Sequence, residues 1–169
     1  MTEEHDLGAV ARSIIDKHRY MTLGTADADG LPWASPVWYA PRDYREFFWV
    51  SSPEARHSRN LAVRPQLAIV IFDSHLAGGW ESLYMAATAE PVADVDDAIA
   101  IFSRRSEARG LPTWMRENVV PPARHRLSRA IASEHFVLDA LDTRLPVSLD
   151  RCSVTPRHRP ESGRRWSAG

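Results

Sequence analysis

Hydrophobic residues near the start of the chain recur first with the spacing of a helix and then with that of strands. Residues 4–17 place apolar side chains every three or four positions, with charged residues between them. This spacing predicts an amphipathic helix. Residues 20–26 and 31–40 have strand character and flank the turn-forming run Asp27-Ala28-Asp29-Gly30, so they are expected to form a β-hairpin.

The second arm of this hairpin contains Pro32 and Pro36. Proline has no backbone N–H to donate to a neighbouring strand. We therefore expect this arm to run along a sheet edge, to carry a bulge or to face a ligand.

Three further segments have strand character. Residues 46–51 are rich in aromatic side chains, which suit a pleated surface. Residues 66–73 form a continuous apolar run, which predicts a strand buried on both faces or nearly so. Residues 81–92 follow a glycine-containing loop at 74–79 and are long enough to bend around a barrel.

Two helices are expected among these strands. Ser52-Pro53-Glu54 offers a capping oxygen, a proline suited to the first helical position and an acid near the positive end of a helix dipole. This predicts a short helix that begins there and ends near Arg64. A second helix is predicted from Val95 to about Arg105, where apolar residues recur at helical spacing, acids come first and bases last.

The last third of the chain is less regular. Residues 110–130 contain three prolines and are interpreted as broken helical turns. Residues 134–140 and 144–149 predict a closing pair of strands. The pattern as a whole therefore predicts a mainly β protein with about six strands and three or four helices.

Length and composition indicate one domain. The chain has 169 residues, of which 44% are hydrophobic, enough for one core but short for two. We assign residues 1–150 to a single domain and expect residues 151–169, rich in Arg, Pro, Ser and Gly, to be a disordered tail. The formal net charge of −1 gives no field that would attract nucleic acid or an anionic membrane, so neither is an expected partner.

Cysteine usage and hydropathy point to the cytoplasm. Cys152 is the single cysteine and cannot form an internal disulfide. The first residues are acidic and do not resemble a signal peptide. No apolar stretch approaches the roughly 18 to 20 residues that a membrane-spanning helix needs.

Familiar catalytic motifs are missing from the sequence. The seven histidines show no His-Glu-x-x-His spacing and no Cys-x-x-Cys pair exists, so a metal site is not expected. The absence of Gly-x-Ser-x-Gly, P-loop and Gly-x-Gly-x-x-Gly motifs removes the simplest hydrolase, NTPase and Rossmann readings. No catalytic side chain can be named from the sequence.

Three segments carry a resemblance to a known family. Residues 24–39 contain an Asp-x-x-Gly-x-Pro turn that leads into a strand; residues 51–61 begin Ser-Ser-Pro-Glu-Ala-Arg-His; and residues 84–92 end in Ala-Glu-Pro-Val. In this order they resemble the flavin-binding split barrel of the pyridoxamine 5'-phosphate oxidase family.

The resemblance implies a six-stranded antiparallel split β-barrel of Greek-key type with flanking helices. It also implies a homodimer with FMN at its interface and an FMN-dependent oxidoreductase that acts on a small organic substrate. Its phosphate segment coincides with a helix N-terminus near Arg56 and Arg59, which is physically suited to an anion. The implied cofactor-binding residues are Ser35, Pro36, Val37, Trp38, Ser51, Ser52, Arg56, His57, Arg59 and Ser82.

The sequence departs from the family at several positions. His57 stands where phosphate-binding members often have lysine, and Ser35 and Ala40 stand where the vitamin-making oxidases have basic residues. A weaker grip on phosphate, or a different cofactor, is expected. The Arg-rich motif those oxidases use for the pyridoxal substrate is not recognisable in residues 157–169, so pyridoxamine phosphate oxidation is not predicted.

Two alternatives therefore stay open. One is a non-catalytic protein that carries flavin or haem, and the other is a reductase that uses a deazaflavin coenzyme as a diffusible co-substrate. The loops at 74–80 and 110–122 match no pattern that would name a substrate or an electron donor.

Overall fold

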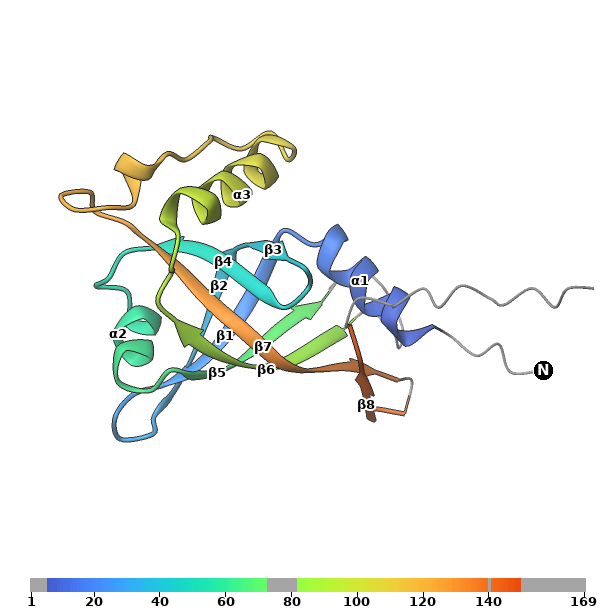
Figure 1. Cartoon of the computed structure of the whole chain (residues 1–169). Coiled ribbons are helices and arrows are strands. Elements are labelled where there is room, and N and C mark those ends of the chain that lie inside the picture. The colour runs from blue at the N-terminus through green and yellow to red at the C-terminus, as the bar shows by residue number, and fades with distance from the viewer. Residues whose placement is uncertain (1–5, 73–81, 140, 150–169) are drawn as a thin grey trace, which may run out of the picture.

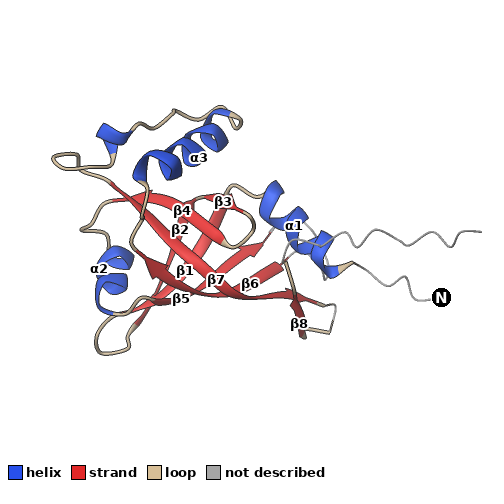
Figure 2. Cartoon of the chain, viewed as in Figure 1, coloured by secondary structure: helices blue, strands red, loops and turns tan. Residues whose placement is uncertain are grey.

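Alternating buried and exposed side chains curl one antiparallel sheet around a core (Figures 1 and 2). The structure is a computed structural model, which describes residues 6–72, 82–139 and 141–149. Within these residues the sheet contains eight strands: β1 (Tyr20–Ala26), β2 (Pro32–Trp38), β3 (Ala40–Arg42), β4 (Glu46–Ser51), β5 (Gln66–Phe72), β6 (Ser82–Glu90), β7 (Arg126–Leu138) and β8 (Arg144–Val147). The expected mainly β fold class is confirmed.

Helices surround the sheet on three sides. They are α1 (Leu7–Lys17), α2 (Arg56–Val63) and α3 (Val95–Glu107), with a short 3-10 helix at Arg116–Asn118. Figure 1 shows α1 and α2 at opposite ends of the sheet and α3 above it. The predicted helix at residues 95–105 is confirmed, and Asp94 caps it by accepting hydrogen bonds from the backbone N–H groups of Asp96 and Asp97, both at 3.0 Å.

The strands follow the order β2-β1-β5-β6-β7-β4-β3, with β8 paired to β7, and every pairing is antiparallel. The proline-containing β2 lies at one end of this order, which confirms the expected edge strand. Eight strands occur rather than six, in part because the strand expected at 31–40 ends at Trp38, and a separate strand, β3, begins at Ala40 and includes part of the expected turn.

The interpretation of residues 110–130 as helical turns is wrong for its last part. Arg126 already pairs with Ser51 of β4, and the ladder continues to Ile131, which pairs with Glu46. Pro121 and Pro122 lie in the turn that precedes this strand and do not interrupt a helix.

The core has two parts that meet at β4. The larger cluster fills the inside of the curled sheet and includes Leu23, Phe47, Trp49 and Ile69. The smaller cluster lies under α3 and includes Phe48. Strand β5 was expected to be buried on both faces, but Gln66, Ala68 and Phe72 on its outer face are exposed, because no described element covers that face.

The start of α2 differs from the prediction. Ser52 does not cap the helix: its hydroxyl accepts the backbone N–H of Glu54 at 3.1 Å, within a turn. The helix begins at Arg56, and the N-cap residue Ala55 has no side-chain oxygen. The predicted end near Arg64 is confirmed.

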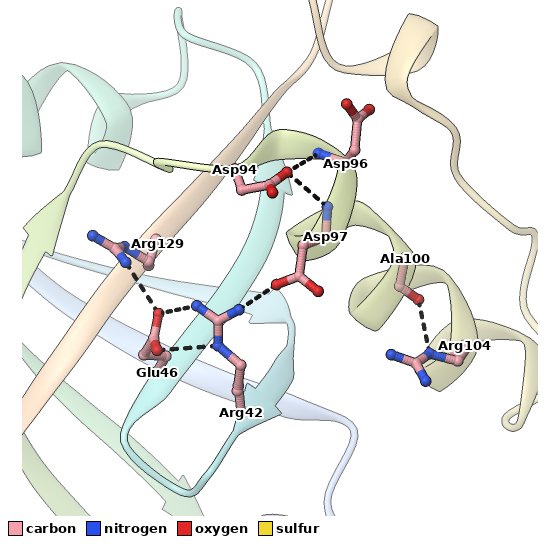
Figure 3. Close-up of polar contacts among 8 residues, drawn as sticks. All are labelled: Arg42, Glu46, Asp94, Asp96, Asp97, Ala100, Arg104 and Arg129. Carbon is pink, nitrogen blue, oxygen red and sulfur yellow. Dashed lines mark hydrogen bonds and ion pairs between the residues drawn. The ribbon is translucent and has the colours of Figure 1, made fainter.

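A network of ion pairs ties α3 to the sheet (Figure 3). The Glu46 carboxylate accepts hydrogen bonds from Arg42 at 3.0 and 2.7 Å and from Arg129 at 3.1 Å. Arg42 also donates to Asp97 of α3, and Arg129 donates to Glu90 of β6 at 3.0 Å. The hydrogen bonds from Arg42 lower the pKa of Glu46 below its usual 4.5.

None of the helices in the described ranges has the length and hydrophobicity of a membrane-spanning segment. In the same ranges, no group of three or more His, Cys, Asp or Glu side chains is placed to hold a metal ion. The expected loop at 74–79, Cys152 and the tail at 151–169 lie outside the described residues.

We expect Glu46→Gln to destabilise the protein by about 1–3 kcal/mol, because Arg129 loses a charged partner while its side chain is only 15% exposed. Since the pKa of Glu46 is lowered by folding, its contribution exists above about pH 4.5 and is lost as the pH falls through the folded pKa. Urea unfolding across this pH range measures both effects.

Asp96→Asn is the matched control, because Asp96 pairs with Arg116 at the surface, where the two side chains are 70% and 54% exposed. It should cost less than about 1 kcal/mol. Equal losses in the two variants would contradict the role of Glu46.

Candidate functional site

The end of β4, helix α2 and the β1–β2 hairpin meet at one end of the sheet. We call this region the barrel mouth. Ser51 ends β4, and its hydroxyl lies 2.9 Å from the Nε2 atom of His57 on α2. His57 is only 7% exposed, and burial lowers the pKa of its imidazole. The structure thus brings together two of the predicted site residues and leaves His57 without charge at neutral pH.

A second polar pair, which the sequence did not reveal, fixes α2 to the hairpin. The buried Asn60 donates its side-chain N–H to the hydroxyl of Thr25 at 3.0 Å, and Thr25 donates in turn to the carbonyl oxygen of Trp33 at 3.3 Å. Asn60 lies three positions after His57, on the same face of the helix. That spacing of two polar residues was the available signal, although it does not identify Thr25 as the partner.

Arg56, the first residue of α2, lies over the hairpin. Its guanidinium carbon is 4.4 Å from the centre of the Trp33 ring, and its Nη2 atom is 4.0 Å from the Asp27 carboxylate. Asp27 also accepts the backbone N–H groups of Asp29 and Leu31, at 3.1 and 2.9 Å. The cation at the barrel mouth is therefore held in place, with part of its charge offset by a carboxylate that shapes the turn.

Ser52 and Arg59 make contacts outside this cluster. Ser52 is engaged in the turn before α2, where its carbonyl oxygen also accepts the Ser58 hydroxyl at 2.8 Å. The Arg59 side chain is 61% exposed, lies 3.8 Å from Glu54 and borders a different cavity from the one that Trp33 borders.

The predicted residues of β2 divide between the two faces of the sheet. Ser35 and Val37 are buried on the inside, and Pro36 is exposed on the outside. Trp38 donates its indole N–H to Ser106 of α3 at 3.1 Å, away from α2. Ser82 begins β6 opposite Phe72, at the far end of the β5–β6 pair from Gln66, which follows α2. Within this chain, Ser82 and Trp38 are not part of the barrel mouth.

The outer face of the sheet carries a groove of about 780 Å³ beside the mouth. Ala34, Gly24, Ala68 and Ala86 lie side by side in its floor, since each is the register partner of the next across β2, β1, β5 and β6. Trp33, whose ring contacts Arg56, also borders the groove. A row of small side chains provides a flat floor on which a planar group could lie.

The match to a known protein family includes all the segments that form the barrel mouth. The family model described as pyridoxamine 5'-phosphate oxidase matches residues 7–137. A pyridoxine/pyridoxamine 5'-phosphate oxidase of Azorhizobium caulinodans is 32% identical over 117 residues, covering 67% of this chain and 52% of the relative. One from Caulobacter vibrioides is 28% identical over 117 residues, covering 66% and 49%. The chain thus spans about half the length of the curated relatives it matches.

Solved structures share the fold at lower sequence identity. A haem storage protein from Vibrio cholerae superposes with a TM-score of 0.62 at 24% identity, covering 82% of this chain and all of the other. A structure titled F420 reductase superposes with a TM-score of 0.56 at 17% identity, covering 73% and 94%. The expected split barrel is confirmed by this likeness.

We expect His57 to titrate below its usual pKa of about 6.5 in the folded protein, because burial disfavours the charged imidazole. Since folding lowers this pKa, neutral His57 contributes stability above about pH 6.5, and the contribution is lost as the pH falls through the folded pKa. An NMR pH titration of the imidazole resonances, assigned with His57→Gln, measures it. A midpoint at or above that of the denatured chain would contradict the burial argument.

Proposed function

The chain belongs to the pyridoxamine 5'-phosphate oxidase family, and from this membership we propose that it is an FMN-dependent oxidoreductase acting on a small organic substrate. The observation that carries the proposal is the uncapped N-terminus of α2, where Arg56 lies over the ring of Trp33, a residue that borders the groove.

The phosphate end of the cofactor fits the start of α2. The first-turn N–H groups of a helix have no acceptor within the helix. Here the N-cap residue, Ala55, has no side-chain oxygen that could accept a hydrogen bond from them. Backbone N–H groups and the helix dipole together favour an anion. Arg56 adds a positive charge, and the hydroxyl of Ser51 with the imidazole of His57 adds polar groups without charge.

The ring of the cofactor fits the groove on the outer sheet face. Trp33, the register partner of the buried Thr25, lies on the α2 side of the hairpin, and the groove lies on the other face of the sheet. A cofactor held at α2 would therefore pass the edge strand β2 beside Trp33 to reach Gly24 and Ala68. When bound, FMN supplies hydride or two-electron chemistry. The chain's own residues would position the ring, hold its phosphate and shield one face from water, and no side-chain acid or base is required.

We propose further that a second copy of the chain covers the groove, as the family resemblance implies. The outer sheet face leaves Tyr20 59% and Phe72 52% exposed, at the far ends of β1 and β5 from α2. Large apolar side chains exposed on the same sheet face as an open groove favour burial against a partner. The dimer would act in the cytoplasm, for which the single cysteine is suited.

The charge of the barrel mouth favours a deazaflavin-dependent reductase as the second candidate. Asp27 lies 4.0 Å from Arg56, and His57 stands where a lysine would add charge. A weak grip on phosphate suits a coenzyme that dissociates after each turnover. A non-catalytic carrier of flavin or haem would use the same groove, and it would bind its cofactor without oxidising a reduced nicotinamide.

We expect FMN to bind the purified protein, with changes in flavin absorbance and fluorescence that saturate on titration. Arg56→Ala should weaken binding about 10- to 100-fold, the range for a lost hydrogen bond to a charged group. Riboflavin, which lacks the phosphate, should bind weakly to both proteins. Arg104→Ala is the control, because Arg104 is exposed on α3, where its guanidinium donates to the Ala100 carbonyl oxygen at 3.4 Å (Figure 3). No binding of FMN by the unaltered protein would overturn the proposal.

We expect Ala68→Glu to convert the dimer to a monomer, because a carboxylate on the groove floor would be buried at the interface without a partner. Light scattering after size-exclusion chromatography measures the mass. Ala100→Glu on exposed α3 introduces the same change elsewhere and should leave the mass unaltered. A monomeric unaltered protein would contradict the dimer without testing FMN binding.

A further inference from the structure

A separate cavity of about 410 Å³ lies between α2, the end of β4 and the start of β7. It is lined by Ser58 and Arg59 of α2, by Trp49 and Ser51 of β4, and by Arg126 and Ser128 of β7. Arg56, His57 and Trp33 of the barrel mouth do not line it. Its volume is in the range of small-molecule sites, about 300–1,000 Å³.

A buried donor without a partner belongs to this cavity. Trp49 is 1% exposed, and in the part of the chain that the structure describes its indole Nε1–H has no hydrogen-bond acceptor. The Nε atom of Arg129, which also lines the cavity, is buried and without an acceptor among the same residues. Buried donors in folded proteins are almost always satisfied, so two in one cavity indicate a missing acceptor.

The charged side chains that line the cavity indicate that the missing acceptor carries a negative charge. Glu90 is its one carboxylate within the described ranges, and it accepts a hydrogen bond from Arg129 at 3.0 Å. Arg126 forms no ion pair with a described residue; its Nη1 atom donates to the carbonyl oxygens of Ala123 and His125, both at 2.6 Å. In the part of the chain that the structure describes, Arg59 has one ion-pair partner, the exposed Glu54, at 3.8 Å. Two arginines therefore remain available for an anion.

We propose that this cavity binds a small organic oxyanion, a carboxylate or a phosphate ester. Its oxygen atoms accept hydrogen bonds from the indole N–H of Trp49 and from Arg126, and its apolar part lies against Leu61, Ala62 and Ala89. The site is distinct from the proposed flavin site and does not depend on flavin binding, although Ser51 belongs to both.

Phenyl phosphate and benzoate are suitable probes, with benzyl alcohol as the uncharged comparison. The readout is the indole N–H resonance of Trp49 in a ¹H–¹⁵N spectrum, assigned with Trp49→Phe. We expect both anions to shift this resonance in a saturable manner and benzyl alcohol to leave it unchanged. Arg126→Gln should weaken binding of the anions at least about tenfold.

Because Arg126 also holds the loop that precedes β7, Arg59→Gln serves as a second variant. Arg59 is 61% exposed and its loss does not endanger folding, while the anion should again bind more weakly. Arg56→Ala should leave the response of Trp49 unchanged, which separates this site from the flavin site. The proposal is overturned if no anion shifts Trp49 in a saturable manner, if benzyl alcohol acts equally, or if Arg56→Ala abolishes the response while Arg126→Gln and Arg59→Gln do not.

Discussion

Strand β4 must bury both of its faces, and the rest of the structure depends on this constraint. Phe47 and Trp49 point into the curled sheet, and Phe48 between them points toward α3. A slip of one residue would exchange the two sets, so the register is fixed from both sides. The end of the strand at Ser51 is fixed with it, and α2 starts five residues later. The position of the barrel mouth is thus decided by packing on β4.

Helix α3 is attached to the sheet by charge as much as by apolar contact. At its first turn Asp97 pairs with Arg42, which shares Glu46 with Arg129 (Figure 3). At its last turn Arg105 donates to the carbonyl oxygens of Ile15 and His18, at 2.8 and 3.0 Å, and so satisfies the end of α1. These contacts cover one side of β4. At the end of the strand, Ser51 contacts His57 of α2 and also lines the second cavity.

Local patterns predicted what depends on neighbours in sequence. The spacing of apolar residues, together with turn and capping residues, predicted α1, the first hairpin, the strands β4, β5 and β6, and α3. The start of α2 was missed because Ser52 can serve equally in a cap or in the turn that precedes one. Asn60 and Thr25 were missed because their contact spans 35 positions and no local pattern reports it. The exposed face of β5 was missed because an apolar run does not reveal whether the same chain covers it.

The charge of the barrel mouth is limited by the turn that builds it. One oxygen of Asp27 accepts two backbone N–H groups of the turn, and its other oxygen faces Arg56. Removing this carboxylate would expose those donors, so the turn retains a negative charge beside its cation. His57 cannot compensate, because the burial that lets it contact Ser51 also keeps it neutral. In the proposed flavin site, the uncapped N–H groups of α2 would therefore act together with Arg56, and their dipoles do not depend on the ionisation of any side chain.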